Sequence, residues 1–191
     1  MKSTLSIIKS TFLVGLLLSS LNVLASNPKV IFKTTMGDIT LELDSKKAPQ
    51  TVKNFLSYVK KGHYVGTVFH RVIDNFMIQG GGMDKNLKAR PGKKSIQNEA
   101  HNGLKNASGT IAMARTSDPH SAKAQFFINV NDNKFLNHKS KTTSGYGYAV
   151  FGKVIKGMSI VNRIKKVKTQ NSGYHANVPV SPIIIKKAYK L

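Results

Sequence analysis

Short runs in which apolar and polar residues alternate constrain the fold of this chain more than any other feature. Residues 30–35 place Val, Phe and Thr on one face of an extended segment, and residues 39–44 place Ile, Leu and Leu on one face of a second. The intervening Met36-Gly37-Asp38 has turn chemistry. Alternation with a period of two is typical of a strand that buries one face. The pattern therefore predicts an antiparallel hairpin near the start of the chain.

Further runs of strand-forming residues follow at short intervals. They cover residues 67–73, 76–79, 110–114, 125–130 and 148–154, and an apolar run at 183–185 comes near the end. Gly80-Gly81-Gly82 is expected to end the second of these runs, and the polar region from there to residue 109 is expected to be surface loop.

Two segments have the spacing of amphipathic helices. In residues 48–62, apolar side chains recur at i, i+3, i+4 and i+7, with Pro49 near the start and Gly62 where a C-terminal cap belongs. A shorter helix is expected over residues 158–164. Many short strands with only two helices predict a mainly all-β barrel or sandwich, and 191 residues suit one domain.

The first 25 residues are expected to be a secretory signal peptide. Two lysines precede an apolar run at residues 11–18, and Val23 and Ala25 occupy the −3 and −1 positions of a cleavage site. The apolar run is too short, and too interrupted by Ser and Asn, for a membrane span. We therefore expect cleavage after Ala25, export to the periplasm and a mature domain over residues 26–191. A retained N-terminal anchor is the alternative.

The chain carries a large excess of positive charge. It has 30 Lys and Arg against 8 Asp and Glu, a net charge of +22, and loss of the two leader lysines would leave +20. Such a charge ordinarily points to nucleic acid. For an exported protein, anionic surfaces and acidic client proteins match better, so no specific nucleic acid is expected. Because the lysines are scattered rather than arranged in a helical stripe, solubility alone is an equally good interpretation.

Several kinds of reactive site have no basis in this sequence. The absence of Cys excludes thiol catalysis, cysteine metal sites and disulfides. The six histidines lack metal-ligand spacing such as HExxH, so no metal is expected. No GxSxG motif is present to expose a nucleophilic serine.

The most informative segment is FHRVI at residues 69–73, followed by FMIQGGG at residues 76–82. It places the guanidinium of Arg71, the imidazole of His70 and the amide of Gln79 among aromatic and thioether side chains. From these residues alone, a packed core with one solvated Arg is the simpler interpretation.

Taken together, the motifs of this chain resemble those of the cyclophilin family of peptidyl-prolyl cis-trans isomerases. Besides FHRVI and FMIQGGG, the resemblance rests on TIAMA at 110–114, Ser121 with QFFI at 125–128, Phe135-Leu136, and VFGKV at 150–154. The motifs occur in family order over residues 29 to 190 and are most similar to those of the exported bacterial branch. The resemblance implies a closed eight-stranded antiparallel β-barrel capped by two α-helices, without a cofactor. It also implies proline-containing unfolded or exported clients, and we expect a monomer.

The resemblance also implies roles for particular residues. Arg71 would be the catalytic residue that stabilises the twisted Xaa-Pro amide, with Gln79 as its hydrogen-bonding neighbour and His70 beside them in the groove. The proline pocket would be formed by Phe76, Met77, Phe127 and Leu136. The other substrate-binding residues, along or beside the groove, would be Ala114, Arg115, Gln125, Phe135 and Tyr148.

Two positions depart from the pattern of many eukaryotic cyclophilins. Phe135 stands where those proteins carry Trp, and Tyr148 where they carry His. The Trp position contributes to cyclosporin binding in such relatives, so weak sensitivity to the drug is expected. Residues 137–147 form a basic stretch that is expected to be flexible and to affect client choice.

Other interpretations of the same residues stay open. The domain could hold proline-containing segments as a chaperone or adhesion factor, with turnover incidental, although binding alone does not require Arg71 and Gln79. Its charge could instead dock it on an anionic surface or a nucleic acid. For the four apolar pocket residues, ordinary core packing is the alternative.

Overall fold

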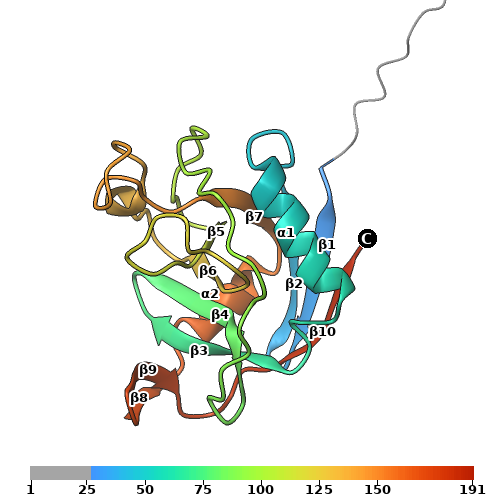
Figure 1. Ribbon diagram of the computed structural model, residues 1–191. Coiled ribbons are helices and arrows are strands. Elements are labelled where there is room, and N and C mark those ends of the chain that lie inside the picture. The colour runs from blue at the N-terminus through green and yellow to red at the C-terminus, as the bar shows by residue number, and fades with distance from the viewer. Residues whose placement is uncertain (1–26) are drawn as a thin grey trace, which may run out of the picture.

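The computed structural model describes residues 27–191, so the expected signal peptide lies outside the described residues. Eight strands form one antiparallel sheet, in the order β10-β1-β2-β7-β5-β6-β4-β3 (Figure 1). The strands are β1 (Lys29–Thr34), β2 (Gly37–Leu43), β3 (Thr67–Ile73), β4 (Met77–Asp84), β5 (Thr110–Met113), β6 (Phe126–Asn129), β7 (Val150–Lys156) and β10 (Ile185–Lys190).

The sheet curls until its two end strands nearly meet. Val68 of β3 forms a bridge with Ile184, which immediately precedes β10. The amide of Phe69 donates to the carbonyl of Ile183 at 3.0 Å, and the amide of Gly66 donates to the carbonyl of Ile185 at 2.8 Å. Such contacts satisfy backbone groups that an open sheet edge would leave unpaired. The predicted eight-stranded antiparallel barrel with two helices is confirmed.

The two helices begin and end close to their predicted positions. They are α1 (Pro49–Lys60) and α2 (Met158–Ile164), and each buries its apolar side chains in the main core. The first turn of α1 contains no acidic residue, but the distant carboxylate of Glu99 accepts hydrogen bonds from the amides of Gln50 and Thr51 at 3.1 and 2.8 Å. A carboxylate at this end satisfies unpaired N–H groups and opposes the positive end of the helix dipole.

Aromatic rings dominate the centre of the main core. Phe32, Phe55, Tyr64, Phe126 and Phe151 are fully buried, and neighbouring rings lie 5.0 to 6.0 Å apart between centroids. These rings come from four strand or helix elements and one connecting loop, so they join the barrel wall to α1.

A second, smaller apolar cluster is separate from the main core. Its buried members are Met77, Ala112, Phe127, Leu136 and Val150. On β6, Phe126 belongs to the main core and the next residue, Phe127, belongs to this second cluster. Successive side chains of a strand point to opposite faces, so the two clusters lie on the two sides of the barrel wall.

The expected end of the second strand-like run at Gly80 is wrong, because β4 continues through all three glycines to Asp84. The glycines are needed because side chains pack directly against this part of the strand. A Cβ on Gly81 would lie 2.8 Å from the rings of both Phe126 and Tyr64, and a Cβ on Gly82 would overlap the side chain of Gln125. Glycine thus permits close approach here rather than ending the strand.

Two elements were not predicted. A short hairpin is formed by β8 (Thr169–Ser172) and β9 (His175–Pro179), and a 3₁₀ helix, η1, spans Lys134–Leu136. The basic segment 137–147 contains no helix or strand, and its proposed flexibility stays a prediction. No helix within residues 27–191 has the length and apolar character needed to cross a membrane.

Candidate active site

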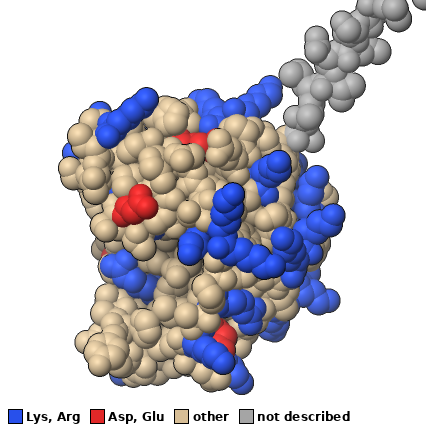
Figure 2. Space-filling view, in the orientation of Figure 1, with Lys and Arg blue, Asp and Glu red and all other residues tan. Residues whose placement is uncertain are grey.

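A groove of about 480 Å³ lies outside the barrel wall, bounded by β3, β4, β6, η1 and the β8–β9 hairpin. In Figure 2 the molecule is hollowed at its left-hand edge, between the hairpin below and the segment around η1 above. Eleven of the twelve site residues predicted from the sequence line the groove: His70, Arg71, Phe76, Met77, Gln79, Ala114, Arg115, Gln125, Phe127, Leu136 and Tyr148. The twelfth, Phe135, does not line it. Within residues 27–191, no group of three or more His, Asp or Glu is placed to hold a metal ion.

An irregularity in β3 brings two consecutive residues to the groove. The register between β3 and β4 shifts between Phe69 and Arg71, whereas Phe69 itself points into the main core. In a regular strand, His70 and Arg71 would face opposite sides. A bulge re-aims side chains at such a point, so both residues line the groove.

A chain of side-chain amides leads to Arg71. Nη1 of Arg71 donates to Oε1 of Gln79 at 3.5 Å, and Nε2 of Gln79 donates to Oε1 of Gln125 at 3.0 Å. The second hydrogen bond orients the Gln79 amide so that its oxygen faces the guanidinium. The Arg71–Gln79 contact is long and therefore weak. Within residues 27–191, the Arg71 side chain makes no other hydrogen bond or ion pair, and it lines the groove.

Gly82 makes room for this amide chain, which leads to a prediction for Gly82→Ala. The added methyl group would overlap Cγ and Cδ of Gln125, so the Gln125 side chain must move and lose its hydrogen bond to Gln79. Loss of one such bond is worth about 1 kcal/mol, so we expect kcat/KM for an Xaa-Pro peptide to fall about fivefold.

The control for Gly82→Ala is the double variant Gly82→Ala/Gln125→Ala. If Gly82 acts through Gln125, the double variant has the same kcat/KM as Gln125→Ala alone, because the two changes remove one interaction. Additive losses in the double variant would contradict this mechanism.

His70 is neutral at physiological pH. Its side chain is buried and its Nδ1 has no hydrogen-bond partner. Burial lowers the pKa of His70 to about 4, and the charges of His175 and Arg71 act in the same direction. A neutral imidazole beside Arg71 adds no competing cation to the groove.

The low pKa of His70 predicts that the protein loses stability as the pH falls from about 6.5 to about 4. The imidazole of the unfolded chain has a pKa near 6.5, so in this range the unfolded state binds a proton that the folded state does not. The free energy of unfolding should decrease by up to about 3 kcal/mol. Urea unfolding at several pH values should show a shallower pH dependence in His70→Gln than in the parent.

The other histidines provide an internal control for this measurement. The pKa of His63 is also lowered by burial, but His63 is present in both proteins, so its contribution cancels in the comparison. Equal pH dependence in the parent and in His70→Gln would show that His70 does not carry the effect.

The apolar part of the groove is formed by the second cluster. Met77, Phe127 and Leu136 are nearly buried and Phe76 is half-buried, so they present a firm apolar surface. Phe135 stacks on the back of Phe76, with ring centroids 5.6 Å apart, and 65% of its surface is exposed. It therefore supports the Phe76 ring from outside the groove.

Arg115 lines the groove, but several of its donors are already engaged. Its Nε donates to the carbonyl of Gly147 at 3.0 Å, and its Nη1 donates to the carbonyl of Thr116 at 2.8 Å. The guanidinium also lies 4.6 Å from the ring centroid of Tyr148. A cation over an aromatic face is stabilised by the ring quadrupole. These contacts indicate that Arg115 positions the side of the groove that Tyr148 forms. The Arg71 side chain has fewer contacts that restrict its position.

A network of buried Asn side chains holds the backbone at Phe76, Leu136 and Tyr148, on this side of the groove. Sequence reasoning missed this network. Nδ2 of Asn106 lies within 3.3 Å of the carbonyls of Leu136 and Tyr148. Asn129 joins Asn106 to Asn133, which donates in turn to the carbonyl of Phe76 at 2.8 Å. Buried amides of this kind hold irregular backbone in one conformation when their partners are satisfied. The abundance of Asn in residues 129–133 is a weak signal that reads equally well as turn chemistry.

Sequence reasoning also missed one side of the groove. Its remaining lining residues are Met83, Tyr174, His175, Ala176 and Asn177, four of which belong to the β8–β9 hairpin and its turn. No alternating apolar pattern marks this hairpin, so no signal in residues 169–179 pointed to it.

The comparison with known families decides the classification. The profile of the family described as cyclophilin type peptidyl-prolyl cis-trans isomerase/CLD matches residues 29–190. The chain belongs to the cyclophilin family. This assignment makes it a peptidyl-prolyl cis-trans isomerase, and the barrel with two helices is the cyclophilin fold.

Bacterial cyclophilins are similar to this chain over nearly their whole length. Peptidyl-prolyl cis-trans isomerase cyp18 of Streptomyces antibioticus is 58% identical over 159 residues, which cover 83% of this chain and 96% of the relative. Peptidyl-prolyl cis-trans isomerase B of Escherichia coli (strain K12) is 54% identical over 157 residues, covering 82% and 96%. A peptidyl-prolyl cis-trans isomerase of Acinetobacter baylyi is 57% identical over 171 residues, covering 90% and 89%.

Solved cyclophilin structures share the fold. A crystal structure of a Cryptosporidium parvum cyclophilin type peptidyl-prolyl cis-trans isomerase has a TM-score of 0.74 at 28% identity, covering 86% of this chain and 98% of that one. The structure obtained in the presence of the dipeptide Ala-Pro has a TM-score of 0.71 at 30% identity, covering 84% and 96%.

Proposed function

We propose that this cyclophilin accelerates rotation of Xaa-Pro bonds non-covalently, with Arg71 stabilising the twisted amide. Resonance imposes a barrier of roughly 18–20 kcal/mol on this rotation, which takes tens to hundreds of seconds uncatalysed. As the C–N bond twists, the prolyl nitrogen loses conjugation and gains a lone pair. A cationic donor aimed at that nitrogen favours the twisted state over both planar states. No bond is broken, so the mechanism needs no nucleophile.

The position of Arg71 carries the proposal. Its guanidinium lines the same groove as the apolar side chains of Phe76, Met77 and Phe127, and its one hydrogen bond to the described part of the chain is the long one to Gln79. An apolar surface can hold the proline ring while excluding water, which strengthens the interaction of the guanidinium with the nitrogen. Arg keeps its charge in such a site because its pKa is very high. A barrier lowered by ~5–7 kcal/mol would give four to five decades in rate.

The test is isomerisation of an Xaa-Pro peptide by residues 26–191, measured by NMR exchange spectroscopy between the cis and trans forms. We expect exchange to become faster in proportion to protein concentration. If the folded protein binds the peptide without accelerating exchange, the proline-binding module replaces the enzyme as the function of this domain.

We further propose that the protein is exported and assists the folding of exported proteins that contain proline. The support is the N-terminal pattern, in which residues 11–18 are apolar and Val23 and Ala25 precede a cleavage site. Expression of the full chain in a two-membrane bacterium, followed by fractionation, tests this. A periplasmic protein that begins at Ser26 is the expected product, and a cytoplasmic or membrane-anchored full-length chain would contradict the proposal.

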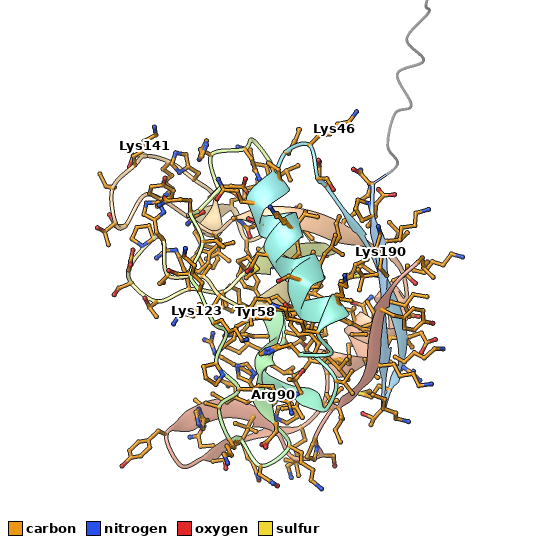
Figure 3. All side chains as sticks on the ribbon, turned by 45° about the vertical axis from the view of Figure 1, so that its right-hand side comes forward. Lys46, Tyr58, Arg90, Lys123, Lys141 and Lys190 are labelled. Atoms are coloured by element: carbon orange, nitrogen blue, oxygen red, sulfur yellow. The ribbon has the colours of Figure 1, made fainter. Side chains whose placement is uncertain are left out.

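A lysine-rich face favours a second role, in which the enzyme docks on an anionic lipid surface. Neither α1 nor β10 contains a carboxylate, and both carry exposed lysines (Figure 2). Those on the two elements and in the loops beside α1 are Lys46, Lys47, Lys53, Lys60, Lys61, Lys186, Lys187 and Lys190. In Figure 3, Lys46 and Lys190 lie on the side of α1, whereas Lys141 lies at the opposite edge of the view. Like charges on one face attract anionic headgroups in a salt-dependent way.

Co-sedimentation of the protein with phosphatidylglycerol vesicles tests the docking face. We expect binding that weakens as salt increases, and that weakens further in Lys53→Glu/Lys190→Glu but not in Lys139→Glu/Lys141→Glu, a control with the same change of net charge. Equal effects of both variants would show that net charge alone acts, and no binding at low salt would remove this role.

A further inference from the structure

The β8–β9 hairpin closes one side of the groove and is held there by the strand that carries Arg71. Four consecutive residues, Tyr174 to Asn177, line the groove together with Arg71 and His70. β9 packs against β3, so the hairpin has a fixed place relative to the proposed catalytic residue. Figure 1 shows the hairpin projecting from the lower left of the barrel, beside β3.

The backbone of this segment is specifically shaped. Gly173 and Asn177 both have left-handed conformations, with φ of 56° and 59°. Asn tolerates this conformation better than other side-chain-bearing residues. Ser172 pairs with His175, so Gly173 and Tyr174 form a two-residue turn that places Tyr174 at the tip of the hairpin, and Asn177 lies within β9.

Tyr174 is an unpaired aromatic ring at the edge of the groove. Its side chain is fully exposed, and none of the aromatic ring pairs within residues 27–191 includes it. The exposed Phe135, by contrast, stacks on Phe76. Near Tyr174 the lining residues His175, Ala176 and Asn177 include no carboxylate and no permanently charged group. A large ring with such neighbours suits an aromatic or large apolar partner better than a charged one.

We propose that Tyr174, together with the adjacent lining residue His175, forms a subsite that selects clients with an aromatic or large apolar side chain close to the proline. The inference rests on the proposed function, because it assumes that the client proline occupies the apolar part of the groove next to Arg71. An extended client advances about 3.3 Å per residue, so residues adjacent to that proline pass along the remainder of the groove and reach the hairpin.

The experiment compares kcat/KM for peptides that share one Ala-Pro core. Three peptides carry Ala at all flanking positions, Phe within two residues before the proline, or Phe within two residues after it. For one of the two Phe peptides, the parent should have a kcat/KM about three- to tenfold above that for the all-Ala peptide. Tyr174→Ala should reduce this ratio to about one, and Tyr174→Phe should retain it.

The matched control is Tyr189→Ala, which removes an exposed Tyr from β10, outside the groove. It should leave the ratio unchanged. Absence of a Phe preference in the parent, or an equal loss for all peptides in Tyr174→Ala, would overturn the subsite. If the parent accelerates none of the peptides, the proposed function fails instead. In that case, peptide affinities measured by NMR titration decide the subsite. The parent should bind one Phe peptide more tightly than the all-Ala peptide, and Tyr174→Ala should bind the two equally.

Discussion

Replacing Arg71 with Ala should lower kcat/KM for Xaa-Pro isomerisation by about 100- to 1000-fold, because the twisted amide then loses the guanidinium that stabilises it. Removing one preorganised donor from a charge-stabilising site typically has an effect of this size. The neighbouring Arg115 cannot substitute, since its Nε and Nη1 are engaged by the carbonyls of Gly147 and Thr116.

The same substitution should leave the fold intact. The Arg71 side chain makes one long hydrogen bond and no ion pair within residues 27–191, so the free energy of unfolding should change by less than about 1 kcal/mol. Thermal unfolding followed by circular dichroism checks this point. A folded Arg71→Ala protein with low activity then reports on chemistry rather than on loss of structure.

Two further variants separate charge from geometry. Arg71→Lys keeps the positive charge but loses the planar set of donors, so its activity should lie between those of the parent and Arg71→Ala. Arg163→Ala removes an exposed Arg of α2, whose Nη2 donates to the Met36 carbonyl outside the groove, and should retain full activity. Parental kcat/KM in folded Arg71→Ala would refute the assignment of Arg71.

The regular strands and helices were predictable because their signals are local. The alternation at residues 30–35 and 39–44, and the helical spacing in residues 48–62, follow from which side chains must be buried. The β8–β9 hairpin gives no such signal because most of its side chains are half-buried or exposed. It is ordered by packing against β3, which lies about 100 residues earlier in the chain.

Most of the site could be named from the sequence, but only through the family resemblance. Taken alone, FHRVI and FMIQGGG fit a packed core, and Phe126 cannot be told from Phe127 until the faces of β6 are known. The bulge in β3 was not predictable either, because it depends on the register with β4. The hydrogen bond between Gln79 and Gln125 joins residues 46 positions apart, and local patterns carry no information on such pairs.

Replacing Phe126 with Ala should lower the free energy of unfolding by about 3–5 kcal/mol, the range for an aromatic side chain removed from a rigid core. Its ring is fully buried and lies 5.3 Å from Phe32 and 5.5 Å from Tyr64, between centroids. Phe32 is held in β1, and the buried hydroxyl of Tyr64 donates to the carbonyl of Ala124 at 3.0 Å, so these neighbours cannot readily collapse into the cavity. Because domains of this size are stable by only about 5–15 kcal/mol, urea unfolding should show a large shift of the midpoint.

Phe135→Ala is the matched control, since it makes the same chemical change on a ring that is 65% exposed. Its loss of stability should stay below about 1 kcal/mol, because only the stacking on Phe76 is removed. The contrast depends on burial alone and not on residue type. Similar losses in the two variants would mean that the aromatic cluster inside the barrel is not the main source of its stability, and that the amide network and the strand pairing hold the groove in place instead.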